Sequence, residues 1–338
     1  MKKYTIYLII PIFILSNLTA TTNEILDQQI LEKKEINSTE KTSFHIDPKK
    51  SLKTNLQEDF QLNSLKNQPM KNAQTAAILS AVLPGAGHLY LDDYQNARYI
   101  FGCYASGYSS IYIGYIYNNF EMIYFGSYAA TLGSFYGIYS AYRDARTYNN
   151  NIGYKYSMPK DSFKELALAS FQPSVLKQPE VWGGYLGAMA LAMGITYFST
   201  KADVLPQCNL QFSDTTPIVA FAIGISEEAL FRGYLQPSLS EVLTPTGGVI
   251  ASSLIFGAAH ITNTIYMSSE DRNDYLKYSL PFITTFGGYL GWMAHRNQSL
   301  KQSVALHAWY DFTLFVMRKV VCSSSIKTDP KVQFSIDF

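Results

Sequence analysis

The stretch Gly224-Ile-Ser-Glu-Glu-Ala-Leu-Phe-Arg-Gly-Tyr-Leu-Gln236 decides how the rest of the chain is interpreted. It places Glu227, Glu228 and Arg232 at the end of an apolar run, 216–226, that contains no charged residue. A charged side chain inside a membrane segment costs about 3 kcal/mol, so such residues indicate function. On a helix Glu228 and Arg232 are four residues apart and share a face, whereas Glu227 points about 100° away. We therefore expect Arg232 to neutralise Glu228 and to leave Glu227 free.

The composition indicates a membrane protein with a polar extension. Charged residues make up 16% of the 338 residues, below the roughly 25% that is usual for soluble domains. The net charge is +1, which gives no reason to expect a nucleic-acid partner. The charged residues are concentrated in the amino-terminal part and in the loops, and long runs elsewhere carry none.

Eight predominantly apolar runs are long enough to cross a bilayer. They predict an all-α, polytopic membrane protein with about eight transmembrane helices after an amino-terminal signal peptide. The first run is interrupted by Leu83-Pro84-Gly85, so it either spans with a kink or dips into the membrane and returns. The runs are 74–91, 99–120, 122–142, 181–200, 216–236, 242–269, 278–294 and 302–317.

The ends of the chain differ in character from these runs. Residues 1–20 combine a basic start, an apolar centre and a small-residue end, as in a signal peptide, with an uncleaved signal anchor as the alternative. Residues 21–75 are polar and predict a largely disordered extracytoplasmic tail. The export signal and the spans predict a multi-pass protein of the bacterial inner (cytoplasmic) membrane, with the lipid bilayer as its surroundings.

The rest of the chain divides into four expected parts. They are a three-helix membrane module (76–142), a basic cytoplasmic loop (143–180), a membrane domain (181–321) and a carboxyl-terminal tail (322–338).

The three cysteines lack a metal-ligand spacing. Cys103 lies in an apolar run and is expected to pack as a small apolar side chain. Cys208 and Cys322 are expected on the same side of the membrane, and whether they pair depends on their geometry.

Three of the last four runs carry ionisable groups in apolar surroundings. Besides the acidic stretch there are His260 in one run, and His307 and Asp311, four residues apart, in the last. A carboxylate in a water-poor cavity can act as a general base, and histidines can ligate a metal or stabilise an oxyanion. This set suits hydrolysis of a protein or peptide substrate by activated water. The chain has neither HExxH nor GxSxG, which argues against a soluble-type zinc protease and a serine elbow.

Three motifs in order resemble those of one protease family. Glu227-Glu228-Ala-Leu-Phe-Arg232 matches EExxxR, Phe256-Gly-Ala-Ala-His260 matches FxxxH, and His307-Ala-Trp-Tyr-Asp311 is similar to HxxxN or HxxxD. These are the motifs of the CaaX protease and bacteriocin-processing (CPBP, or Abi) family of intramembrane endopeptidases. The resemblance covers about 181–321.

The resemblance implies a role for each motif residue. Glu227 activates the water and His260 helps to hold it, while His307 and Asp311 stabilise the oxyanion. Glu228 and Arg232 form a structural ion pair. Many members have asparagine where this chain has Asp311, and an aspartate donates a hydrogen bond only when protonated. For Asp311 a role in orienting His307 or supporting a metal is therefore favoured.

A Zn²⁺ ion with Glu227, His260 and His307 as ligands is compatible with these residue types, and so is water activation without a metal.

Two other functions remain compatible with the same residues. One is a non-catalytic membrane scaffold or bacteriocin-immunity-type protein of the same fold. The other is a proton-coupled transporter, because buried Glu, His and Asp also build proton relays. No inverted repeat is evident between the two halves of the chain, which argues against the transporter.

Overall fold

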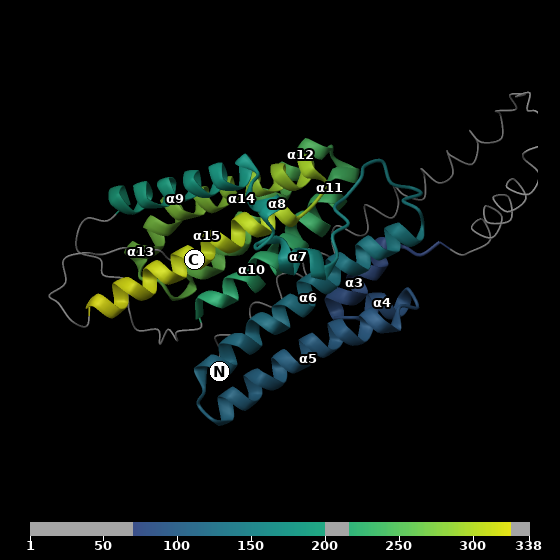
Figure 1. Cartoon of the computed structure of the whole chain (residues 1–338), viewed down its shortest axis with the longest axis horizontal. Coiled ribbons are helices and arrows are strands. Elements are labelled where there is room, and N and C mark those ends of the chain that lie inside the picture. Colours follow the sequence, from purple (N-terminus) through teal and green to yellow (C-terminus); the bar gives the residue numbers. More distant parts are fainter. Residues whose placement is uncertain (1–69, 200–215, 326–338) are drawn as a thin grey trace, which may run out of the picture.

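The computed structural model describes residues 70–199 and 216–325, and within these ranges all regular structure is helical (Figure 1). The all-α class expected from the sequence is therefore confirmed for this part of the chain. Several expectations fall outside the described residues. These are the signal peptide (1–20), most of the polar tail (21–75), most of the carboxyl-terminal tail (322–338), and the side chains of Cys208 and Cys322.

One helical segment among the described residues, Pro245–Ile265, is long and apolar enough by itself to cross a membrane. It has 21 residues and runs through α12 (Pro245–His260) into the 3₁₀ turn η4 (Ile261–Tyr266). Several other helices are equally long but carry many tyrosines and other polar side chains. The eight expected spans therefore remain a prediction.

The first expected span is a pair of short helices, α3 (Ala73–Val82) and α4 (Ala86–Tyr90). With ten residues, α3 is about 15 Å long, half of the roughly 30 Å hydrocarbon core. The break falls at Pro84-Gly85, where Gly85 has φ +92° and a Cβ would lie 2.6 Å from the carbonyl oxygen of Ala97. Only glycine fits this turn, so the run bends back instead of continuing as one helix.

The two long helices α5 (Tyr94–Ile116) and α6 (Phe120–Tyr148) form an antiparallel hairpin (Figure 1). Small residues let their backbones approach: a Cβ on Gly107 would lie 2.6 Å from the carbonyl oxygen of Gly126. Asn119 caps α6, because its side chain accepts from the backbone N–H of Met122 at 3.1 Å.

The helix α6 continues six residues beyond the expected start of the cytoplasmic loop at residue 143. The two arginines in this extension find partners in the following segment. Arg143 donates to the carbonyl of Asp161 at 2.6 Å, and Arg146 donates to the carbonyl of Tyr156 at 2.5 Å. The charge of these arginines suggested that the loop begins here, but their hydrogen bonds to the following segment keep them in the helix.

Two short helices follow α6 and lead into the second half of the chain. They are α7 (Phe163–Ala169), which begins with a capping box formed by Ser162 and Glu165, and α8 (Pro173–Leu176). The long helix α9 (Pro179–Ser199) comes next.

The second half contains the sequence motifs. Its central helix is α10 (Val219–Glu228), which contacts both α6 and α15, while α12 packs on α14. The elements in order are η2 (Thr216–Ile218), α10, η3 (Ala229–Leu235), α11 (Gln236–Val242), α12, η4, α13 (Ser269–Asp274), η5 (Tyr275–Ser279), α14 (Leu280–Asn297) and α15 (Lys301–Ser325).

The amino-terminal module and the motif-bearing half share one apolar core, because α6 lies beside α10 (Figure 1) and also contacts η3. The rings of Tyr142 and Tyr234 meet edge to face at 5.2 Å. Gly233 faces the ring of Tyr139, where a Cβ would approach to 2.4 Å. The two expected domains are thus packed as one unit in the described residues.

Candidate active site

The acidic stretch lies at the end of α10 and the start of η3, which is a π-helical segment. Residues 224–236 are expected to form a continuous α-helix, but the backbone widens to π geometry directly after Glu228. Widened turns of this kind are rare in helices and are frequently found at functional sites. They change where the following side chains point, although Glu228 and Arg232 still meet.

Glu228 and Arg232 form a buried ion pair, with 2.8 Å between Oε1 and Nη1. Their side chains are 0% and 1% exposed, so each charge depends on the other and on further hydrogen bonds. Arg232 also donates through Nη2 to the carbonyl of Gly287 at 3.0 Å. The pair therefore ties the end of α10 to α14.

The guanidinium of Arg232 lies over the ring of Phe256, 4.2 Å from its centroid. The ring in this cation–π contact belongs to α12, the helix that carries the second motif. The ring of Phe256 meets that of Phe231 edge to face at 5.0 Å. The phenylalanine of the second motif is thus a packing surface for the arginine of the first.

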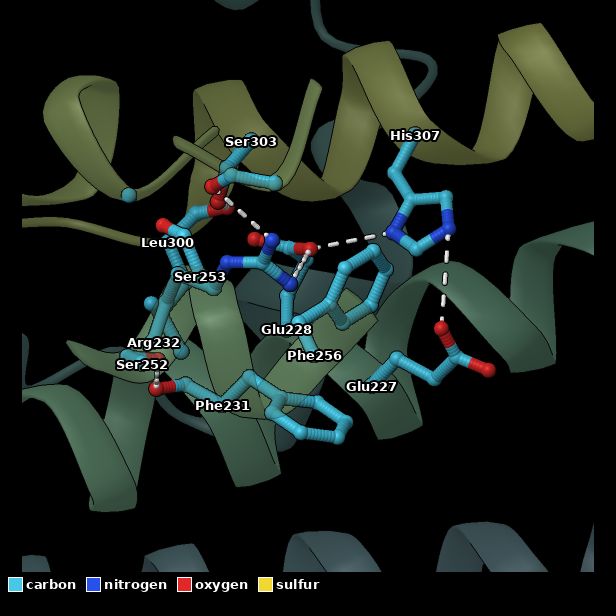
Figure 2. Close-up of polar contacts among 12 residues, drawn as sticks. Glu227, Glu228, Phe231, Arg232, Ser252, Ser253, Phe256, Leu300, Ser303 and His307 are labelled. Atoms are coloured by element: carbon cyan, nitrogen blue, oxygen red, sulfur yellow. Dashed lines mark hydrogen bonds and ion pairs between the residues drawn. The ribbon is translucent and has the colours of Figure 1, made fainter. Parts of the chain in front are cut away.

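His307, on α15, is the residue that joins the two glutamates (Figure 2). Its Nδ1 donates to Oε1 of Glu228 at 3.0 Å. Its Nε2 lies 3.8 Å from Oε2 of Glu227 and 3.5 Å from Oδ2 of Asp311. Nδ1 of the imidazole is therefore held by the ion pair, and Nε2 is directed at the carboxylates of Glu227 and Asp311.

Glu227 is the accessible member of the acidic pair. Its side chain is 23% exposed, compared with 0% for Glu228. Its Oε2 has no hydrogen-bond partner within the described residues. A buried carboxylate oxygen that lacks a protein partner, next to an imidazole nitrogen, is suited to hold a water molecule.

His260 ends α12, and its Nδ1 lies 2.7 Å from the carbonyl oxygen of Phe256. A carbonyl only accepts, so Nδ1 carries the hydrogen and Nε2 is left as an acceptor when the ring is neutral. The rings of Phe256 and His260 are 4.5 Å apart. The hydroxyl of Tyr275 donates to the carbonyl of His260 at 3.2 Å and so fixes the end of the helix.

The described residues do not form a ready metal centre. Within 70–199 and 216–325 no group of three or more His, Cys, Asp or Glu side chains is arranged to hold a metal ion. Glu227 and His307 are close, but no ion pair in this part of the chain links His260 to either glutamate. Zinc ligation by Glu227, His260 and His307 remains a prediction from residue types alone.

The structure places five of the six expected site residues in direct contact. Glu228 contacts Arg232 and His307, and His307 faces Glu227 and Asp311. His260 joins them through Phe256, whose ring lies 6.1 Å from that of His307.

Two features of the site were not expected from the sequence. The first is the bond from Glu228 to His307, since helical spacing pairs Glu228 with Arg232 but says nothing about another helix. The second is the acceptor Gly287. The charge-free run 278–294 gives no signal for a backbone carbonyl that binds arginine.

The fold and the site together define a helical protein with an acid–base cluster buried between α10, α12, α14 and α15. Residues 212–313 match the family model described as type II CAAX prenyl endopeptidase Rce1-like. All three motifs lie within this segment, and the match confirms the family resemblance drawn from them. The family is one of membrane-embedded proteases. Comparisons with curated proteins and with solved structures gave no match.

Proposed function

We propose that the protein is an intramembrane endopeptidase that hydrolyses a peptide bond with a water activated by Glu227. The family match supports a protease. The observation that carries the mechanism is the arrangement around His307, where Nε2 faces the carboxylates of Glu227 and Asp311 while Nδ1 is held by Glu228.

In the proposed reaction Glu227 accepts a proton from a water molecule that also donates to Nε2 of His260. The water oxygen attacks the scissile carbonyl carbon, and the C=O electron pair moves onto oxygen. The protonated imidazole of His307 donates from Nε2 to this oxyanion, and Glu228 stabilises the imidazolium through Nδ1. Glu227 then delivers its proton to the amide nitrogen as the C–N bond breaks.

The buried ion pair serves this reaction by fixing positions. Arg232 neutralises Glu228, and Glu228 orients His307. A shift of about 1 Å at a reacting group can cost about 100-fold in rate. Glu228 and Arg232 are therefore positioning residues, whereas Glu227, His260 and His307 contact water or substrate.

The test is a comparison of Glu227→Gln with the wild-type chain. Membranes from cells that express each form are compared by proteomics for fragments that depend on the wild type, and the purified full chain is then assayed on the peptides found. We expect Glu227→Gln to abolish cleavage while the protein remains folded. Glu121→Gln, an exposed glutamate at the start of α6, is the matched control and should cleave normally.

Unchanged fragments in Glu227→Gln membranes would overturn the mechanism. The scaffold or immunity function instead predicts that Glu227→Gln keeps the cellular phenotype and that Gly257→Leu removes it, since a Cβ at Gly257 would lie 2.0 Å from Oγ1 of Thr284. Uptake driven by a pH gradient in proteoliposomes would indicate the transporter.

The metal question is decided on the same purified protein. Zinc held by Glu227, His260 and His307 predicts a stoichiometric metal content that is lost in His260→Ala and a rate that falls with chelators. Water activation without a metal predicts a rate that chelators leave unchanged.

A further inference from the structure

The helix α6 turns one face away from its hairpin partner. Gly126 and Gly133 face α5, where Cβ atoms would lie within 3 Å of its backbone. The opposite face carries Tyr124, Tyr128, Tyr139 and Tyr142, which helical spacing of about 100° per residue places on one side. We call these four residues the tyrosine face.

The carboxyl-terminal part of the tyrosine face contacts the segment that carries Arg232. Tyr139 packs on Gly233, and Tyr142 packs on Tyr234. Tyr128 lies eleven residues before Tyr139, about three helical turns, so it points to the same side. Since α6 also contacts α10 itself, Tyr128 faces the helix that carries Glu227.

Tyr128 lies within electrostatic range of the site. The carboxylates of Glu227 and Asp311 are close enough for their charges to act on its phenol. The hydroxyl of Tyr128 donates to that of Tyr124 at 3.4 Å, a long contact for two hydroxyl groups. Because this hydrogen bond is weak, the hydroxyl of Tyr128 can turn towards a substrate at little energetic cost.

The site is rich in acceptors and poor in donors. Glu227 and Asp311 only accept when ionised. Arg232 directs Nη1 to Glu228 and Nη2 to Gly287. Nδ1 of His307 is also engaged with Glu228. The proposed mechanism therefore gives a developing oxyanion one donor from the motif-bearing half, Nε2 of His307, and a second donor would stabilise it further.

We propose that Tyr128 is a catalytic residue supplied by the amino-terminal module, and that its hydroxyl donates a hydrogen bond to the oxygen of the scissile carbonyl. This rests on the proposed protease function. It places part of the active site outside the segment 212–313 that matches the family, in a module whose contribution the three motifs do not reveal. The donor that an ionised Asp311 does not provide would then come from α6.

The experiment uses the full chain in liposomes and a pool of fluorescence-quenched peptides that includes a farnesylated CaaX-type peptide. Loss of one oxyanion donor typically lowers kcat by about 100-fold or more. We expect Tyr128→Phe to lower kcat to this extent with little change in KM. A peptide phosphinate, which resembles the tetrahedral intermediate, should also bind Tyr128→Phe about 100-fold more weakly.

Tyr108→Phe is the matched control. Tyr108 pairs with Tyr104 on α5 at 4.8 Å, much as Tyr128 pairs with Tyr124 on α6, but it is 40% exposed on the hairpin. This variant should cleave at the wild-type rate. A Tyr128→Phe rate within twofold of the wild type, with Glu227→Gln inactive, overturns the role of Tyr128 and leaves the proposed function standing. A Glu227→Gln variant that still cleaves the peptide overturns the proposed function itself, and with it the role of Tyr128.

If Tyr128→Phe does not fold, photocrosslinking decides. The crosslinker p-benzoylphenylalanine is placed at position 128 in the Glu227→Gln chain, which retains the peptide uncleaved. An adduct with the peptide supports contact between residue 128 and substrate. Adducts with the protein's own helices alone overturn it.

Discussion

At the scale of single residues, the two adjacent glutamates have different surroundings. Helical phase alone separates them: Glu228 shares a face with Arg232, and Glu227 does not. The structure shows the same difference in burial, since Glu228 is fully buried between Arg232 and His307 whereas Glu227 is 23% exposed. A sequence can predict this division because it depends on one helix, whereas the partner His307 comes from another.

The buried ion pair should be sensitive to the loss of one partner. Arg232→Leu leaves Glu228 at 0% exposure with only His307 to balance its charge. Removing one member of a buried pair typically costs about 3–5 kcal/mol of stability. We expect a loss of this size in thermal or denaturant unfolding of the purified protein.

Arg232→Lys is the control for that prediction. It keeps the charge but loses the two-pronged contact to Glu228 and Gly287. Its stability should fall between those of the wild type and Arg232→Leu. Equal stability of all three proteins would show that the pair does not hold α10 to α14.

Asp311 differs from the other site residues because asparagine often occupies this position in the resembling family. Its Oδ2 lies 3.5 Å from Nε2 of His307, where the side-chain oxygen of an asparagine can also lie. We expect Asp311→Asn to keep the cleavage rate within about tenfold, whereas Asp311→Ala loses about 100-fold because His307 loses its neighbour. If both variants cleaved one peptide at the wild-type rate, Asp311 would have no role in the mechanism.

At the scale of helices, the apolar runs predicted where helices occur better than where they end. The long helices lie on the expected runs, but α6 continues to Tyr148 because Arg143 and Arg146 bond to the next segment. The first run divides into α3 and α4 at Gly85. Such ends depend on contacts and on single turns, which hydropathy does not record.

The contact between α6 and η3 can be tested at one glycine. A Cβ at Gly233 would lie 2.4 Å from the ring of Tyr139. Overpacking of this kind typically costs about 1–3 kcal/mol. We therefore expect Gly233→Ala to destabilise the purified protein by about this amount in thermal unfolding.

Gly102→Ala is the same substitution on α5, at a position where a Cβ meets nothing within 4 Å. Alanine is favoured over glycine in a helix by about 1 kcal/mol. This control should therefore be neutral or slightly stabilising. If both variants behave alike, the α6–η3 contact does not contribute to stability.

At the scale of the whole molecule, parts of the chain that differ in sequence character pack against one another in the described residues. The amino-terminal module and the motif-bearing half share a core that includes Tyr139, Tyr142, Leu230 and Tyr234. The polar links are equally direct: Gln74 of α3 accepts from the hydroxyl of Tyr234 at 2.9 Å. Contacts between segments so distant along the chain leave no pattern in one sequence.

This packing predicts that both parts lose their structure in one transition. Cys103 lies on α5 in the module, far along the chain from Glu227, and its thiol is free and half-buried. In a chain with Cys208→Ser and Cys322→Ser, its labelling by a membrane-permeable maleimide reports on the module, while peptide cleavage reports on the site. Because Leu230 and Tyr234 depend on α6 for burial, we expect labelling to rise and cleavage to be lost at the same temperature. Cleavage that persists above the temperature at which Cys103 becomes exposed would instead mean that the motif-bearing half stays folded without the module, and that Tyr128 is not part of the active site.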